Sequence, residues 1–535
     1  MVTGGQALVE ALDAWGVQVI FGIPGIHTLA IYDALYGHPR IRHVTARHEQ
    51  GAGFMADGYA RASGRVGVVL TTTGPAAVNA LTPMGEAYAD SSPVLLIASG
   101  LDEGSAGEER GALHEMRDQF GTLKSVCGRG RRVLAVEEIP RAVSEAFVAL
   151  CGGRPRPYVL EVPLEVLDAE AEVGPCDTEV EPAAGPDRED LVRAAELIGA
   201  AERPLVVVGR GAQDAAAEVR QLAECIQAPV GMTVNGRGTV AADHPLCLGD
   251  AGSRRLGPLQ RSLGPDFGRW LDRADLVIAI GTRLGERVVR AWDAEIGRLI
   301  HLDIDPEVIG CRYEPEVALV GDARQGVQVL LELLGEEVRR SGWDLGEIAN
   351  EGQEAEGEYP FPEILDAVRR VVDRDAVVTN DMTMISYQAR RLFPVYSPRG
   401  FLSPHYYGTL GFSVPAAVGA KIACPQRQVV ALAGDGGFMF TVQELATAKQ
   451  QRLNLPIVLC NDNCYTAIQR AHERRFGARY VGVELENPDF VQLAQSFGIN
   501  GVRVTSCAAL AGALAEALRA ELPTLIEVYL PKFDA

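Results

Sequence analysis

Two acidic turns in the last quarter of the sequence have the residues that a metal ion needs. The first is Gly434-Asp435-Gly436-Gly437, and the second is Asn461-Asp462-Asn463. Two carboxylates suit a hard cation such as Mg²⁺, which keeps few protein ligands and shares phosphate oxygens. Glycines let the backbone approach a phosphate closely, and the N-terminus of a following helix favours anions. The pair predicts one metal and diphosphate site; an ordinary glycine turn is the simpler alternative.

The elements around these turns place both aspartates at one edge of a sheet. Val429–Ala433 and Leu455–Cys460 are short apolar runs, which predict buried strands. Thr441–Glu444 has the pattern of a capping box, which predicts a helix from about Val442 to Arg452. Such a strand–helix–strand crossover joins parallel strands, and ligands bind beyond their carboxyl ends.

The whole chain has material for several domains. Its 535 residues, of which 47% are hydrophobic, predict about three domains. Helix and strand patterns alternate over residues 1–170, 189–335 and 360–535, which predicts α/β domains with parallel sheets. Residues 171–188 and 335–359 are acidic and contain proline or glycine, so we expect linkers there.

Charge and cysteine content exclude several classes of partner. The net charge of −21 argues against nucleic acid and anionic membranes as partners. We find no signal peptide and no apolar run long enough to span a membrane. The ten cysteines form no C-x-x-C pair, which argues against zinc and disulfides. The sequence thus predicts a cytoplasmic protein.

Three blocks of the sequence resemble the thiamine diphosphate enzymes, in their acetolactate synthase and 2-oxo acid decarboxylase group. The blocks follow the family's order and cover nearly the whole chain. The resemblance implies three consecutive doubly wound parallel-sheet domains, which are pyrimidine-binding, middle and diphosphate-binding. Besides the two acidic turns, the matching stretches are Phe21–Gly25, Arg47–Arg61, Thr73–Pro75 with Asn79, Arg203–Gly211, Leu276–Gly281 and Ile300–Pro306.

The resemblance implies thiamine diphosphate and Mg²⁺ as cofactors. Asp435 and Asp462 match metal ligands, and Cys464 matches a third ligand that binds through its backbone carbonyl. The other positions that match cofactor contacts are Gly74, Asn79, Thr383, Gly408, Leu410, Gly434, Gly436, Gly437 and Tyr465.

The Gly408–Gly411 segment matches the loop that bends the cofactor. Leu410 would wedge between the two rings, and the Gly408 carbonyl would accept a hydrogen bond from the amino group. Leu410 can alternatively be a core residue at the start of the following helix, and Thr383 can be a turn or helix cap.

Glu49 matches the glutamate that activates the cofactor through its pyrimidine nitrogen. Its neighbours Gly51–Ala56 are small or apolar, and a carboxyl group in such surroundings can share a proton with the ring. The alternative is a surface helix residue. The resemblance places this glutamate and the diphosphate site on different subunits, which implies a homodimer with intersubunit active sites and, further, a homotetramer.

Candidates on the substrate side are histidines. His27 lies in a loop that faces the substrate in relatives, and His114 lies near a position where relatives have Gln or His. Either can donate a proton or bind a carboxylate, and either can equally be structural. Tyr407 is a weaker candidate of the same kind.

Several positions depart from the named relatives. Pyruvate decarboxylase-like enzymes carry acids where this chain has Ile26 and Ile468, and acetolactate synthases carry Trp where it has Ala471. The segment Gly252–Trp270 replaces the glycine-rich flavin segment, so a bound FAD is doubtful, although Arg283 and Arg287 match that subgroup. The N-terminal block is most similar to decarboxylases of bulky or polar 2-oxo acids, such as 5-guanidino-2-oxopentanoate decarboxylase.

The resemblance therefore implies decarboxylation of a 2-oxo acid through an enamine intermediate, with release of an aldehyde. The main alternative is carboligation of two 2-oxo acids, as in acetolactate synthesis. A flavin-linked 2-oxo acid oxidase and a non-catalytic nucleotide-binding protein are further alternatives. Glu49 argues against the last, because a scaffold has no use for a carboxylate there.

Overall fold

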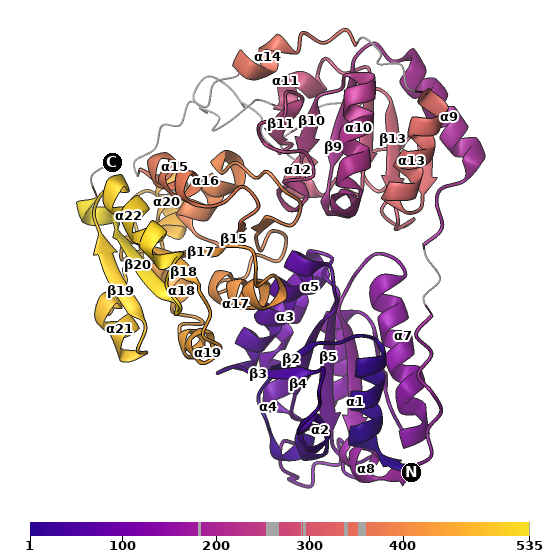
Figure 1. Cartoon of the computed structure of the whole chain (residues 1–535), viewed down its shortest axis with the longest axis vertical. Helices are drawn as coiled ribbons and strands as arrows, with labels where there is room; N and C mark the ends of the chain where they lie inside the picture. Colours follow the sequence, from indigo (N-terminus) through magenta and orange to yellow (C-terminus); the bar gives the residue numbers. More distant parts are fainter. Residues whose placement is uncertain are drawn as a thin grey trace.

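Three parallel sheets organise the chain into three lobes (Figure 1). The computed structural model describes residues 1–179, 183–252, 267–289, 292, 296–335, 341–350 and 360–533. Each lobe has one six-stranded sheet, and every strand pair in these three sheets is parallel. The predicted α/β class with three consecutive parallel-sheet domains is confirmed.

The N-terminal sheet has the strand order β3-β2-β4-β5-β7-β6. Its strands are β2 (Val19–Gly22), β3 (Arg42–Thr45), β4 (Gly67–Thr71), β5 (Val94–Gly100), β6 (Gly130–Arg132) and β7 (Tyr158–Pro163). Its helices are α1 (Gly4–Ala14), α2 (Leu29–Leu35), α3 (Glu49–Ser63), α4 (Pro75–Asn79), α5 (Leu81–Ala89), α6 (Gln119–Cys127), α7 (Ile139–Cys151) and α8 (Leu164–Asp168). Because side chains alternate along a strand, Val69 packs towards α3 whereas Val68 and Leu70 pack towards α1 and α7. Helices therefore cover both faces.

The middle sheet has the order β11-β10-β9-β12-β13-β14. Its strands are β9 (Pro204–Val208), β10 (Val230–Met232), β11 (Cys247–Asp250), β12 (Leu276–Ile280), β13 (Leu299–Asp303) and β14 (Val317–Val320). Its helices are α9 (Arg188–Ala200), α10 (Ala216–Ile226), α11 (Phe267–Leu271), α12 (Glu286–Val289), α13 (Ala323–Leu334) and α14 (Gly346–Asn350). One face packs on α9, α10 and α13, and the other on a tryptophan-rich cluster.

The C-terminal sheet has the order β16-β15-β17-β18-β20-β19. Its strands are β15 (Val377–Thr379), β16 (Phe401–Leu402), β17 (Val429–Gly434), β18 (Pro456–Asn461), β19 (Asn500–Val504) and β20 (Thr524–Tyr529). Its helices are α15 (Phe361–Val371), α16 (Met384–Leu392), α17 (Ser413–Ala423), α18 (Asp435–Phe438), α19 (Glu444–Gln450), α20 (Thr466–Phe476), α21 (Phe490–Ser496) and α22 (Cys507–Ala517). The two predicted strands on either side of the first acidic turn are β17 and β18, and they pair in parallel.

The N- and C-terminal lobes share one hydrophobic core. Helices α3 and α17 lie side by side between the two sheets (Figure 1). Their close approach requires glycine, because a Cβ atom at Gly58 would overlap the backbone of Ala416 and one at Gly419 would overlap Met55.

Two expectations about local structure are wrong. Of the stretch expected to be a linker over 335–359, residues 336–340 and 351–359 lie outside the described residues. Its described part, 341–350, contains α14, and Trp343 packs on Trp270 with ring centroids 5.0 Å apart. The predicted capping box does not form, because Thr441 Oγ1 donates to the Gly411 carbonyl (2.9 Å), and α19 begins only at Glu444. In both cases a tertiary contact outweighs the local composition. Among the described residues, no helix has the length and hydropathy to cross a membrane.

Candidate active site

Asp435 and Asp462 lie side by side beyond the ends of two neighbouring strands. Gly434 at the end of β17 pairs with Cys460 near the end of β18, so both aspartates follow at the same sheet edge. Asp435 is only 3% exposed. Burial and the neighbouring carboxylate of Asp462 raise the pKa of Asp435 to about 6, and burial also raises the pKa of Asp462. The buried carboxylate of Asp435 and the half-buried one of Asp462 repel each other, and a divalent cation between them would relieve that repulsion.

The second acidic turn is folded back on Asp462. Its Oδ1 atom accepts a hydrogen bond from the Cys464 N–H at 3.2 Å, and its Oδ2 atom accepts one from Thr466 Oγ1 at 2.5 Å. Asn463, which lies between Asp462 and Cys464, has a left-handed φ of 56°, and asparagine tolerates this conformation better than most residues. The turn thus brings the backbone of Cys464, the third predicted ligand, against Asp462.

Sequence reasoning missed Asn487 at this site. Its side-chain amide donates to Asp435 Oδ2 at 2.7 Å, and also to the side-chain oxygens of Asn461 and Asn463 at 3.1 and 3.2 Å. It therefore ties the two acidic turns together. The available signal was the Asn487-Pro488 dipeptide, which marks a turn, but nothing in its spacing connects it with Asp435.

The glycines of the first turn form a cradle against which other predicted residues pack. A Cβ atom at Gly434 would overlap Thr383 Oγ1, and one at Gly436 would overlap the ring of Tyr465. The absence of side chains here keeps the backbone of the turn and the start of α18 accessible to a phosphate. Among the described residues no group of three or more His, Cys, Asp or Glu side chains forms a metal cluster. The donor set therefore fits an ion that takes most of its ligands from phosphate and water.

A cavity of about 270 Å³ joins the predicted cofactor and metal residues of the C-terminal lobe, but Tyr407 is not among its lining residues. Its described lining residues all lie between Phe361 and Leu530, so none comes from the N-terminal or middle lobe. Leu410 is half-buried and lines this cavity, which argues against the alternative that it is ordinary core. The predicted residues in the lining are Thr383, Gly408, Leu410, Gly434, Asp435, Gly436, Gly437, Asp462, Cys464 and Tyr465.

Glu49 lies elsewhere in the chain, as the first residue of α3. Its Oε2 atom accepts a hydrogen bond from Asn79 Nδ2 at 3.0 Å, which joins two of the predicted N-terminal residues. Helix α3 is buried from Gly51 to Ala62, but Glu49 itself is half-buried. Within one chain, the apolar pocket that we expected around this carboxylate is therefore incomplete.

His27 and His114 form a pair near the same sheet edge. Their ring centroids lie 5.1 Å apart in an edge-to-face arrangement, and the Nδ1 atoms of both are buried without a hydrogen-bond partner among the described residues. Burial, together with His114, lowers the pKa of His27. Gly74 packs on this pair, because a Cβ atom there would lie 2.6 Å from the His114 carbonyl oxygen.

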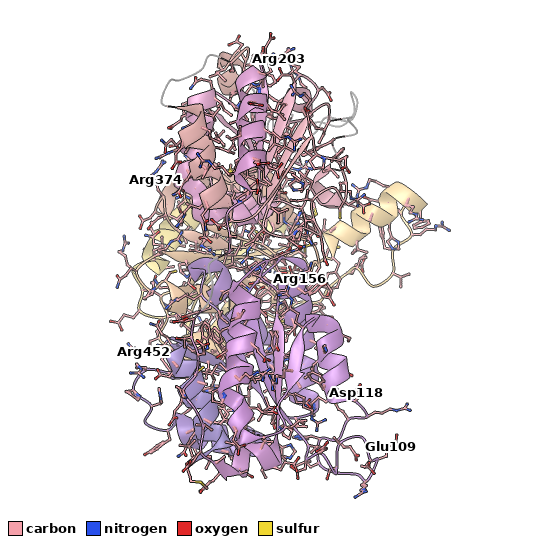
Figure 2. All side chains as sticks on the ribbon, turned by 90° about the vertical axis from the view of Figure 1, so that its right-hand side faces the viewer. Glu109, Asp118, Arg156, Arg203, Arg374 and Arg452 are labelled. Atoms are coloured by element: carbon pink, nitrogen blue, oxygen red, sulfur yellow. The ribbon has the colours of Figure 1, made fainter. Side chains whose placement is uncertain are left out.

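Gln119 was also missed by sequence reasoning. Its Oε1 atom accepts from the Gly74 N–H at 2.6 Å, and its Nε2 atom donates to the buried carboxylate of Glu161 at 2.7 Å. Gln119 therefore holds the Gly74 turn in place. It lies at the start of α6, beyond the segment 101–118 whose Glu109 and Asp118 are labelled in Figure 2.

The predicted residues thus form two separate groups in one chain. Glu49, Asn79, Gly74, His27 and His114 belong to the N-terminal lobe, and the metal, glycine-turn and Leu410 residues belong to the C-terminal lobe. The side chains of the first group could transfer a proton, and those of the second could bind a metal and a diphosphate.

Family models match all three lobes. The N-terminal TPP binding domain of thiamine pyrophosphate enzymes matches residues 2–122, the central domain matches residues 191–330, and the C-terminal TPP binding domain matches residues 381–528. The relatives below align over almost the entire chain. The chain belongs to the thiamine pyrophosphate enzymes. Its cofactors are therefore thiamine diphosphate, which is the same compound, and Mg²⁺, and it is an enzyme of the lyase or transferase kind.

The similar proteins of this thiamine enzyme family include both decarboxylases and synthases. A probable 2-ketoarginine decarboxylase of Pseudomonas aeruginosa is 38% identical over 93% of this chain and 88% of its own length. A probable acetolactate synthase large subunit of Methanocaldococcus jannaschii is 33% identical over 99% of this chain and 92% of its own. The acetolactate synthase isozyme 2 large subunit of Escherichia coli is 33% identical over 100% of this chain and 96% of its own.

A second cavity of this thiamine enzyme lies where the three lobes meet. Its volume is about 410 Å³, and its lining includes Arg210, Arg283 and Tyr406. Arg283 donates to the Ala89 carbonyl at 2.6 Å and stacks on the Tyr406 ring. Most of the segment on which the doubt about FAD depends, residues 253–266, lies outside the described residues, as does the side chain of Arg287.

Proposed function

We propose that this enzyme decarboxylates a 2-oxo acid and releases an aldehyde. The observation that carries the proposal is the His27–His114 pair in the N-terminal group that also holds Glu49. Its two unpartnered Nδ1 atoms can bind the substrate carboxylate or hold the proton that the product needs. Among the described residues that line the C-terminal cavity, the acids are Asp435 and Asp462, which would hold the metal. Ile468, which is 54% exposed, stands where pyruvate decarboxylase-like enzymes carry an acid.

The two groups of residues have different tasks in this proposal. When bound, thiamine diphosphate supplies the carbon nucleophile and the electron sink that decarboxylation requires. Asp435, Asp462 and the Cys464 carbonyl would hold Mg²⁺ and through it the diphosphate. Glu49 would hold a proton at the pyrimidine ring, and Leu410 would keep the cofactor bent. Thr383, Tyr465 and the glycine turn would exclude water from the diphosphate.

We infer that the active site forms between two subunits of a homodimer. The cavity with the metal residues has no lining from the N-terminal lobe among the described residues, and Glu49 is half-buried. Large apolar side chains next to both groups are exposed in the single chain, which is typical of surfaces that another chain covers. They are Ile26, Val78 and Leu113 on one side and Tyr407, Met439, Phe440 and Ile468 on the other. From the family resemblance we further propose that two such dimers assemble into a homotetramer.

Carboligation is the second candidate function. It is favoured by the acetolactate synthase relatives, which align along the full chain. Incubation with pyruvate separates the two: acetaldehyde supports decarboxylation, and acetolactate supports carboligation. A panel of 2-oxo acids that includes 2-ketoarginine, with CO₂ release as the readout, tests the substrate class that the Pseudomonas relative's name suggests.

A flavin-linked oxidase is a third candidate. The cavity at the junction of the lobes could hold an additional group, and the absorption spectrum of the purified protein decides whether a flavin is bound. A colourless protein that releases CO₂ without consuming oxygen would exclude this candidate.

We place the enzyme in the cytoplasm. None of the ten cysteines, all of which lie in the described part of the chain, forms a disulfide, although Cys127, Cys225 and Cys460 are buried where a disulfide would be protected. Cysteines without disulfides fit a reducing compartment. Fractionation of the source cells tests this assignment.

A further inference from the structure

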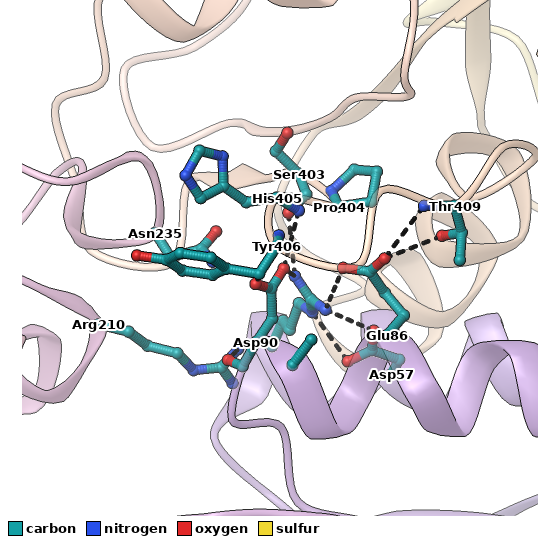
Figure 3. Close-up of polar contacts among 12 residues, drawn as sticks. Asp57, Glu86, Asp90, Arg210, Asn235, Ser403, Pro404, His405, Tyr406 and Thr409 are labelled. Atoms are coloured by element: carbon teal, nitrogen blue, oxygen red, sulfur yellow. Dashed lines mark hydrogen bonds and ion pairs between the residues drawn. The ribbon is translucent and has the colours of Figure 1, made fainter. Parts of the chain in front are cut away.

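A buried cluster of charged side chains joins the N-terminal lobe to the C-terminal lobe (Figure 3). Arg61 of α3 donates two hydrogen bonds of 2.8 Å to the Asp57 carboxylate and one of 3.0 Å to Asp90, and it lies 3.6 Å from Glu86. All four side chains are at most 3% exposed. Burying charges is costly even when they are paired, so the cluster needs an explanation beyond stability.

The carboxyl groups of this cluster hold the backbone of the loop between β16 and α17. Glu86 Oε2 accepts from the Gly408 N–H at 3.2 Å, the Thr409 N–H at 3.3 Å and Thr409 Oγ1 at 3.0 Å. Asp90 accepts from the N–H groups of His405 and Tyr406 at 3.0 and 3.2 Å. Irregular loops lack the backbone partners that helices and strands have, so these bonds determine the conformation of the loop.

The held loop carries two of the predicted cofactor contacts. Gly408 and Leu410 line the cavity with the metal residues, whereas Glu86 does not. Gly408 has a left-handed φ of 78°, and Gly411 has one of 81°. The turn thus uses glycine where a left-handed backbone is needed. Glu86 of the other lobe fixes the N–H groups of Gly408 and Thr409, whereas Asp381 of the same lobe accepts from the Gly411 N–H at 3.1 Å.

We propose that Glu86 is a positioning residue, which sets the place of the Gly408 carbonyl and the Leu410 side chain in the cofactor site of its own chain. The inference rests on the proposed function, in which those two groups bend thiamine diphosphate. In an intersubunit dimer, each N-terminal lobe then serves two sites. It gives Glu49 to the partner's cavity, and through Glu86 it shapes the cavity of its own chain.

The charge state of the cluster agrees with this role. Burial raises the pKa of Glu86 well above its ordinary value, and the Asp90 carboxylate adds to the rise. Burial would raise the pKa of Asp90 as well, but Arg61 holds it well below its usual range. Burial lowers the pKa of Arg210, which donates to the Asp90 carbonyl, to about 9, so this arginine stays charged at neutral pH. Burial and the neighbouring Asp90 carboxylate thus both favour the protonated form of Glu86.

An amide has nearly the same shape as a carboxyl group and keeps one side-chain oxygen as an acceptor. In Glu86→Gln, the side-chain oxygen can still accept from Gly408 and Thr409, whereas Glu86→Ala removes the acceptor. The test is amide hydrogen exchange of the full-length protein without cofactor, followed in peptides that cover 403–411. We expect Glu86→Ala to speed exchange at Gly408 and Thr409 about tenfold, and Glu86→Gln to restore the slow exchange.

The second readout uses the loaded enzyme. We expect Glu86→Ala to lower kcat by about 100-fold, because a displacement of about 1 Å has such an effect, and to slow exchange of the cofactor's C2 proton. If Glu86→Ala fails to fold, Thr409→Val replaces it in the test, because it removes only the hydroxyl donor to Glu86. Thr409→Val should also speed amide exchange in 403–411 and lower kcat. Unchanged amide exchange in Glu86→Ala, or equal damage in Glu86→Gln, would overturn the proposal. A wild-type protein that binds no thiamine diphosphate would instead overturn the proposed function and leave the amide exchange result standing.

Discussion

The carboxylate of Glu444 accepts a hydrogen bond from the His48 N–H at 3.0 Å, across 396 residues of sequence. It also accepts from the Arg47 N–H at 3.1 Å and from Thr447 Oγ1 at 2.7 Å. Both backbone donors directly precede Glu49, so the C-terminal lobe determines where α3 begins. Glu444 of the C-terminal lobe thus holds the backbone next to Glu49 of the N-terminal lobe. Glu86 of the N-terminal lobe conversely holds the backbone of Gly408 in the C-terminal lobe.

The first prediction concerns stability and pH at Glu444. Burial raises its pKa to about 7. The folded state therefore holds the proton more tightly than the unfolded state, and this stabilisation is complete below about pH 4.5 and is lost as the pH rises through about 7. In Glu444→Gln this side chain no longer titrates, so its pH-dependent loss of stability is removed. From about pH 5 to pH 8, the free energy of unfolding of the variant should rise relative to that of the wild type by roughly 3 kcal/mol.

Thermal unfolding of both proteins at the two pH values measures this change. Because the lobes need not unfold together, the compared quantity is the difference in Tm between variant and wild type. A difference that stays constant with pH would show that Glu444 is ionised throughout.

The second prediction concerns the metal. Asn487 donates to Asp435 and to both asparagines of the second acidic turn. Asn487→Ala should lower the affinity for Mg²⁺ about 10- to 100-fold, as loss of a group that orients a metal ligand does. A higher Mg²⁺ concentration would then be needed for cofactor binding. Titration of Mg²⁺ with cofactor binding as the readout measures it. Asn454→Ala is the matched control, because that amide donates to the carbonyls of Ala517 at the end of α22 and of Ala520 after it.

The third prediction separates a cofactor contact from a core residue. Leu410 is half-buried and lines the cavity, whereas Leu432 is fully buried in β17. Leu410→Ala should cost less than about 1 kcal/mol of stability, but Leu432→Ala should cost about 2–5 kcal/mol. Leu410→Ala should nevertheless lose most of the activity. If Leu410→Ala instead lost much stability but kept normal activity per folded molecule, Leu410 would be a core residue and not a cofactor contact.

The fourth prediction tests the shared site. Glu49→Gln and Asp435→Ala should each be inactive, the first while still binding Mg²⁺ and thiamine diphosphate. When the two variants are co-expressed, about half of the dimers should be mixed, and each mixed dimer should contain one intact site of two. The whole mixture should then regain roughly a quarter of the wild-type activity, and mixed dimers isolated through two different tags roughly half. If each site were built within one chain, every site of the mixed dimer would carry a defect and no activity would return.

Much of the C-terminal half-site could be predicted because its information is local. Strand, turn and helix follow one another within a few residues, and parallel pairing then brings Asp435 and Asp462 to one edge. The same logic failed at Thr441, whose capping pattern is local but whose hydroxyl group binds the Gly411 carbonyl instead. A hydrogen bond to a buried carbonyl is worth more than a solvated cap.

The sequence by itself determined the family, the cofactors and the three parallel sheets, and the family resemblance already implied that Glu49 and the diphosphate site belong to different subunits. Only the tertiary structure decided that Asn487, Gln119, Glu86 and Glu444 contact the candidate site residues or their neighbours. These residues act across tens to hundreds of positions. A carboxyl or amide group on a helix has the same local pattern whether it faces water or a loop of another lobe, so its task becomes visible only when the chain is packed.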